Sequence, residues 1–182
     1  ILPTHKGSVI IDATACPQDI AYPTDIDLLN ASREKSEQLI DLIYQESLHQ
    51  NKPRIYREIA RNKYLKIAQN KNKTKKKIRQ AIRAQLNFLK RNLKHLNTML
   101  DKFEEKDFPL KPKEHKYLLV IQELYRQQYQ MYITNSHSVD DRIVSIHQPH
   151  VRPIVRGKGN AKVEFGSKIN VSLVDGYSFL DE

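Results

Sequence analysis

A repeating apolar pattern between residues 78 and 100 constrains the fold of this chain more than any other feature. Apolar side chains recur there at steps of three or four residues, at Ile78, Ile82, Leu86, Leu89, Leu93, Leu96 and Leu100. This spacing places them along one stripe of an α-helix, and such a stripe is stable when it packs against another helix. Residues 113–132, after the break at Pro109 and Pro112, carry the apolar residues of an antiparallel partner. The pattern therefore predicts a packed helical segment.

Two further helices are expected before this segment. Thr24 followed by Asp27 resembles a capping box, which predicts a helix from residue 25 to about residue 50. Four charged residues are expected on the solvated side of this helix: Arg33, Glu34, Lys35 and Glu37. A second helix is expected over residues 54–70. Together with the later helices, these predict a helical insert over residues 25–134.

Strand patterns lie on both sides of the insert. Residues 9–11 are consecutive β-branched apolar residues, which predict a short buried strand that Asp12 closes. Residues 161–174 alternate apolar with polar side chains, which predicts a half-buried strand with Gly166 at a bulge. The pair Asp175-Gly176 is typical of a two-residue hairpin turn, and a return strand is expected after it.

These patterns predict an α/β fold class, with α+β character within this stretch of chain. The first three strands of a partial sheet are expected, interrupted by a large basic helical insert. The expected domain organisation is 1–24 for the first strand and the turn that carries Asp12, 25–134 for the insert, and 135–182 for a linker and the second and third strands. Because three strands leave a bare sheet edge, further strands are expected beyond residue 182.

The net charge of +10 is concentrated in one part of the chain. Between Lys52 and Lys94 there are sixteen Lys and Arg residues and one acid, Glu58, a net charge of +15 that leaves −5 for the rest. A block of one sign in an otherwise acidic chain is typical of a contact with a polyanion. The candidate DNA-binding residues in this block are Lys71, Lys73, Lys75, Lys76, Lys77, Arg79 and Arg83. A second basic cluster, around a later turn, adds Arg152, Arg156 and Lys158.

Asp12 is the candidate metal ligand. A buried carboxylate costs several kcal/mol unless it is paired or binds a cation, and ligand sites lie at the carboxyl ends of strands. The alternative is that Asp12 caps the turn after its strand. Glycine-rich nucleotide loops, a Ser-His-Asp order and an HExxH pattern are all missing, which disfavours kinases, hydrolases and zincins. The lone Cys16 excludes a disulfide within the chain, and no apolar run is long enough to span a bilayer, so we expect a cytoplasmic protein without a membrane partner.

Several stretches in order resemble one protein family. They are residues 9–14, 20–25, 28–33, 151–158 and 163–168, and together they resemble bacterial insertion-sequence transposases with an Asp-Asp-Glu catalytic triad. The resemblance implies a ribonuclease-H-like core that a helical insert interrupts after the first strand, and it implies that Asp12 is the first acid of the triad. It also implies Mg²⁺ or Mn²⁺ as cofactor, duplex DNA at transposon ends as partner, and a location with the bacterial nucleoid.

The resemblance does not extend to the rest of the triad. Asp175, Asp181 and Glu182 do not occupy the positions expected for the second and third acids, so residues 1–182 alone are expected to be inactive and to hold no metal ion. Two alternatives remain open. The chain could be a non-catalytic nucleic-acid-binding module in which Asp12 caps a turn, or a helical interaction domain in which the stripe of residues 78–100 pairs with a second copy as a homodimer.

Overall fold

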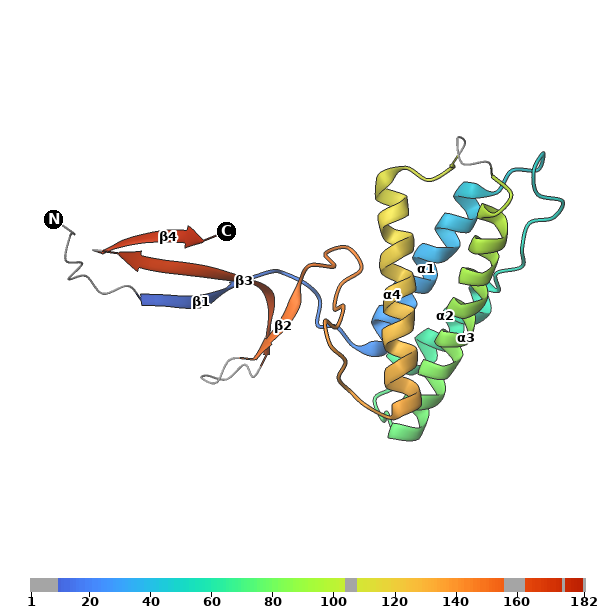
Figure 1. Ribbon diagram of the computed structural model, residues 1–182. Helices are drawn as coiled ribbons and strands as arrows, with labels where there is room; N and C mark the ends of the chain where they lie inside the picture. Colours follow the sequence, from blue (N-terminus) through green and yellow to red (C-terminus); the bar gives the residue numbers. More distant parts are fainter. Residues whose placement is uncertain (1–9, 104–107, 156–162, 175, 182) are drawn as a thin grey trace. The chain divides into compact units, whose positions relative to one another are not determined.

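The computed structural model describes residues 10–103, 108–155, 163–174 and 176–181 (Figure 1). The chain divides into two compact units, which are described separately. Residues 22–149 form the helical unit, and residues 1–21 and 150–182 contain the strand unit. The mixed helix and strand content agrees with the predicted fold class. The ribonuclease-H-like form of the sheet stays a prediction.

The helical unit contains α1 (Asp25–Ile43), α2 (Arg57–Ala68), α3 (Lys75–Leu100) and α4 (Pro112–Thr134). Figure 1 shows α1 and α3 running in one direction and α2 and α4 in the other. The predicted antiparallel packing of α4 on α3 is confirmed, and α1 makes a still more extensive contact with α3. The reason is that α1 carries its own apolar stripe, with Leu29, Ile40 and Ile43 fully buried.

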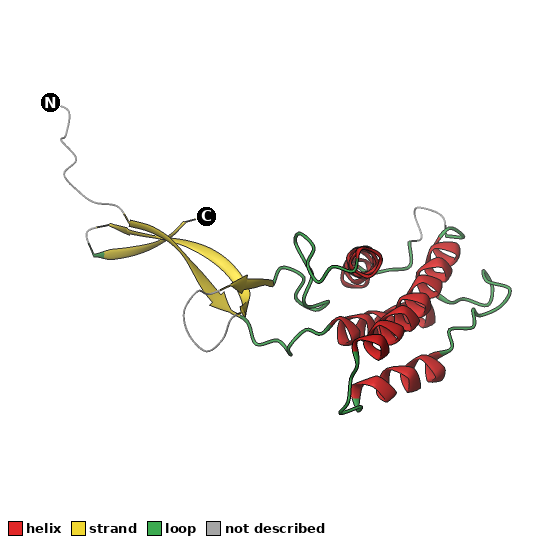
Figure 2. Ribbon diagram, turned by 90° about the horizontal axis from the view of Figure 1, so that it is seen from below, coloured by secondary structure: helices red, strands yellow, loops and turns green. Residues whose placement is uncertain are grey.

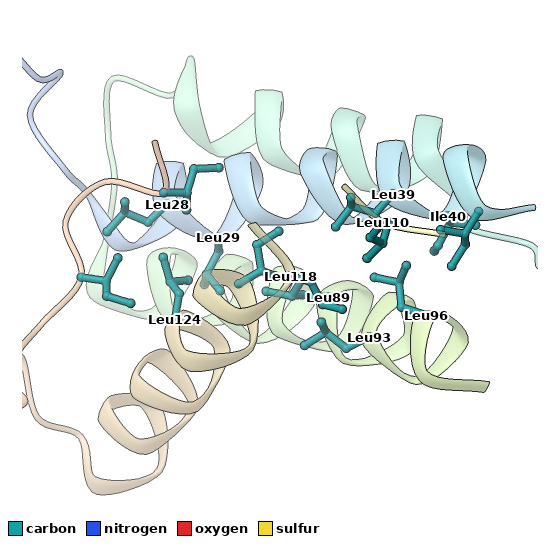
Figure 3. Close-up of a cluster of buried hydrophobic side chains, with 14 of the residues drawn as sticks. Leu28, Leu29, Leu39, Ile40, Leu89, Leu93, Leu96, Leu110, Leu118 and Leu124 are labelled. Atoms are coloured by element: carbon teal, nitrogen blue, oxygen red, sulfur yellow. The ribbon is translucent and has the colours of Figure 1, made fainter. Parts of the chain in front are cut away.

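The apolar stripe of α3 forms the centre of the helical core. Leu89 and Leu96 are completely buried, and both belong to the cluster drawn in Figure 3, together with Leu29 of α1 and Leu118 of α4. The predicted packing of this stripe is therefore confirmed. Because the stripe is covered by other helices of the same chain, it is not the surface on which a second copy would pair.

Helix α1 ends at Ile43, earlier than the expected end near residue 50. The physical reason is His49, which is only 3% exposed. Its Nδ1 lies 3.1 Å from the backbone nitrogen of Gln45, its Nε2 lies 3.2 Å from the carbonyl oxygen of Met99, and its ring stacks on Tyr44. These contacts require a turn after α1 rather than further helix.

The segment after α4 also belongs to the helical unit. Helix α4 stops at Thr134, and Asn135 follows with a positive φ of 54°. Ile143 and Ile146 then return to the helical core, and the backbone N–H of Ile143 donates to Oε1 of Gln127 at 2.9 Å. The sequence predicts a linker at the start of residues 135–182; in the structure, the residues up to 149 belong to the helical unit, with Ile143 and Ile146 in its core.

The strand unit is built on one long strand. It contains β1 (Ile10–Pro17), β2 (Arg152–Val155), β3 (Val163–Val174) and β4 (Tyr177–Asp181), with β1, β2 and β4 all paired antiparallel to β3 (Figure 2). β1 lies along one edge of β3, whereas β2 and β4 follow each other along the opposite edge. Gly166 forms the end pair of both ladders, opposite Pro17 on one edge and Arg152 on the other, with one residue facing one residue, so the predicted bulge is wrong.

The predicted hairpin joins β3 to β4. Val174 pairs with Tyr177, which leaves two residues in the turn, and Gly176 has a φ of +84°. Glycine adopts this left-handed conformation without steric cost, and a glycine with positive φ is typical of tight hairpin turns. The hairpin is therefore confirmed, although Asp175 itself lies outside the described residues.

Asp12 lies inside β1 and does not close it. It is the third residue of a strand that continues to Pro17, and its register partner on β3 is Val171. The expectation of a strand end at Asp12 is wrong, and so is the alternative that Asp12 caps a turn. The cause is long-range: β3 is long enough to pair with every residue of β1, so the small residues after Asp12 continue the ladder.

Candidate nucleic-acid interface

The structure brings most of the predicted basic residues onto adjoining segments. Lys71 and Lys73 lie in the loop between α2 and α3, and the other five members of the first group lie on the first half of α3. All seven side chains are exposed. Arg152 lies on β2 in the strand unit, whose placement relative to the helices is not determined. Arg156 and Lys158 lie outside the described residues.

The first turn of α3 carries an unusual concentration of positive charge. Thr74 caps this helix, because its Oγ1 accepts a hydrogen bond from the backbone N–H of Lys77 at 3.3 Å. Lys75, Lys76 and Lys77 then occupy the first turn. A helix N-terminus already bears partial positive charge, so lysines there are repelled by the helix dipole. An anion bound at this end would be stabilised by the helix dipole and by the lysines. Residues that break a local stability rule in this way are expected at functional sites.

Two further lysines join this surface through the packing of α2 on α3. Lys63 and Lys66 of α2 and Lys77 of α3 line a groove between the two helices, with Ile67 and Ala81 also among its lining residues. None of the described residues that line this groove is acidic. The sequence placed Lys63 and Lys66 in the charged block but did not single them out, because their position beside Lys77 depends on how the helices pack.

Arg79 is held in place on the other side of α3. Its guanidinium lies 4.3 Å from the ring centre of Tyr132, and its Nη1 donates to Oδ1 of Asn135 at 2.9 Å. Both partners belong to the end of α4, so Arg79 is oriented by tertiary contacts while its side chain stays exposed. We call the exposed cations of this region the basic surface, and its members are Lys63, Lys66, Lys71, Lys73, Lys75, Lys76, Lys77, Arg79 and Arg83.

An ion-pair network that is buried on its α1 side joins α1 to α2. Arg33 is fully buried and Glu37 is 2% exposed, so the expectation that both lie on a solvated face is wrong. Arg33 pairs with Glu37, and its Nη2 donates to Oδ1 of Asn30 at 2.7 Å. The other oxygen of Glu37 accepts from Nε of Arg57 at 3.1 Å. Burial is possible because each charge has an opposite charge and hydrogen bonds.

The acids of α1 also compensate Arg57, a half-exposed cation at the start of α2. Nη2 of Arg57 donates to Asp41 at 2.6 Å, and this hydrogen bond, together with that to Glu37, raises the pKa of Arg57. Burial opposes ionisation of Asp41, but hydrogen bonds from Lys52 and Arg57 outweigh it and lower its pKa below the usual value. Arg57 therefore anchors α2 to α1, and the lysines on the outer side of α2 face solvent.

For Asp12, the predicted metal ligand, the structure describes only the position of the backbone. Asp12 lies in β1, and its side chain is outside what the structure describes. Among the described residues, no group of three or more His, Cys, Asp or Glu side chains is arranged to hold a metal ion. Binding of Mg²⁺ or Mn²⁺ through Asp12 therefore stays a prediction.

Comparison of the chain with protein-family models, with curated proteins and with solved structures finds no match. In the part of the chain that the structure describes, no helix has the length and apolar character needed to cross a membrane.

Proposed function

We propose that the helical unit binds duplex DNA through the basic surface. The observation that carries this proposal is the lysine-rich first turn of α3, which continues across the α2–α3 groove through Lys63, Lys66 and Lys77. Phosphate groups of a duplex are the polyanion that suits an extended surface of this kind, because each neutralised phosphate releases counterions. Contacts with phosphates position a protein on DNA without reading its sequence.

The resemblance to insertion-sequence transposases supports a more specific role. On this proposal the DNA is a transposon end, and the chain is part of an enzyme that cleaves DNA and joins strands. Asp12 would be the first of three carboxylates that hold divalent ions, and such ions activate an attacking hydroxyl and stabilise the leaving oxygen of a phosphodiester. The alternative, a DNA-binding module without catalysis, shares the basic surface and differs in the role of Asp12.

The proposal predicts a steep salt dependence of DNA binding that originates in α3. Changing Lys75, Lys76, Lys77 and Arg79 to glutamine should flatten the slope of log affinity against log salt by about 0.9 for each phosphate that the protein no longer neutralises. The measurement is fluorescence anisotropy of a labelled duplex at several salt concentrations.

Three lysines of α1 and α4, away from the basic surface, provide the control. Nζ of Lys35 lies 4.3 Å from the ring centre of Tyr117, and Lys113 and Lys116 line a small pocket beside the same ring. Changing these three lysines to glutamine lowers the net charge by a similar amount but should leave the slope nearly unchanged. An equal flattening by both variants would mean that the chain attracts DNA by net charge alone, and the proposed surface would be wrong.

A further inference from the structure

A second groove, between α3 and α4, combines aromatic rings with positive charge. Its volume is about 350 Å³. Arg83, Asn87 and Lys90 of α3 line one side, and Tyr125 and Tyr129 of α4 line the other. None of the described residues that line it is acidic. The groove therefore suits an anionic ligand that also has flat apolar faces.

The tyrosines of this groove are arranged for stacking. The rings of Tyr125 and Tyr129 are nearly parallel, with an interplanar angle of 17° and 5.9 Å between their centres. Tyr125 packs against the helical core, whereas Tyr129 is 45% exposed, and the neighbouring Ile133 is 58% exposed. The side chains of Tyr129 and Ile133 on α4 are thus exposed to solvent in the groove that Arg83 and Lys90 also line.

We propose that this groove binds single-stranded nucleic acid, with a base stacked on Tyr129 and the adjoining phosphates on Arg83 and Lys90. The bases of a duplex are stacked on each other, so an exposed tyrosine ring can stack on a base only where the strand is unpaired. Charge and ring chemistry together favour this occupant over an apolar protein segment, which would leave two cations without partners.

The inference rests on the proposed function and extends it. Arg79 and Arg83 belong to the basic surface, and Lys90 lies two turns beyond Arg83 on the same side of α3. A strand that leaves a duplex on the basic surface could therefore follow α3 into the groove. The inference therefore adds unpaired DNA as a second ligand class, beside the duplex DNA of the proposed function.

The test compares two probes, a short labelled oligothymidylate and a labelled duplex, by fluorescence anisotropy. Changing Tyr129 to alanine should weaken binding of the oligothymidylate roughly 5- to 150-fold, the range found when one stacking ring is removed, and should change duplex binding little. Tyr177→Ala removes a tyrosine that is 73% exposed on β4 and serves as the control that should affect neither probe.

A second variant reports on stacking directly. The chain contains no tryptophan, so Tyr129→Trp introduces a single indole that keeps a stacking surface. Its affinity for the oligothymidylate should stay near that of the unmodified protein, and its fluorescence should be quenched on binding. Unchanged fluorescence, or a Tyr129→Ala variant with full affinity for the oligothymidylate, would overturn the groove proposal. If Tyr129→Ala does not weaken oligothymidylate binding while duplex binding remains salt-sensitive, the groove proposal fails and the proposed function stands. If the unmodified protein binds neither probe, both the groove proposal and the proposed function are overturned.

Discussion

Replacing Glu37 with alanine is expected to lower the free energy of unfolding of the helical unit by about 3–5 kcal/mol. The change removes the carboxylate that pairs with fully buried Arg33 and also accepts a hydrogen bond from Arg57. Arg33 would keep Asn30 and the half-exposed Glu34 as partners, but its buried charge would lose its closest compensation. Urea unfolding followed by the circular dichroism of the helices measures the effect.

Two controls separate the effect of the buried charge from that of reduced packing. The double variant Arg33→Met/Glu37→Leu removes both charges while keeping apolar volume, so it should be clearly more stable than Glu37→Ala. Changing Glu123 to alanine breaks an ion pair with exposed Arg126 and should have a far smaller effect. If Glu37→Ala is no more damaging than Glu123→Ala, the ion-pair network does not hold α2 on α1.

Replacing Asp12 with asparagine in a chain that carries the complete acidic triad is expected to abolish DNA cleavage and strand transfer while leaving DNA binding intact. Asparagine keeps the shape of the side chain but loses the charge that would hold a divalent ion. Because Asp12 lies within β1, opposite Val171, the backbone pairing of the strand does not depend on the carboxylate. Cleavage and strand-transfer assays with Mg²⁺, and separately with Mn²⁺, measure the effect.

Asp140→Asn is the matched control for this substitution, since Asp140 is an exposed residue of the loop after α4. It should retain full activity. Cleavage by the Asp12→Asn variant at the rate of the unmodified enzyme would contradict the catalytic role and favour the non-catalytic DNA-binding module.

Local sequence patterns were sufficient to predict much of the fold. The apolar stripe of α3, the helix cap at Thr24 and the hairpin before Tyr177 depend on residues that are close in sequence, and the structure contains all three. The charged block likewise indicated an exposed basic region from composition alone. The interactions that produce these features, such as helix capping and turn formation, join residues that are only a few positions apart.

The features that could not be predicted depend on contacts between distant residues. Arg33 is buried because α2 supplies Arg57 to the same acid, Glu37, and no pattern within α1 signals this. The strand of Asp12 continues because β3, which lies at the other end of the chain, pairs with it. The early end of α1 follows from the contact of His49 with Met99 of α3.

Protection of lysines from chemical acetylation, measured by mass spectrometry with and without duplex DNA, tests the central claim most directly. If the basic surface binds DNA, the duplex should protect the seven lysines of that surface: Lys63, Lys66, Lys71, Lys73, Lys75, Lys76 and Lys77. Lys113 and Lys116, which are also exposed but line the pocket beside Tyr117, should react equally in both samples. Protection of Lys113 and Lys116, with the lysines of α2 and α3 still reactive, would contradict the account.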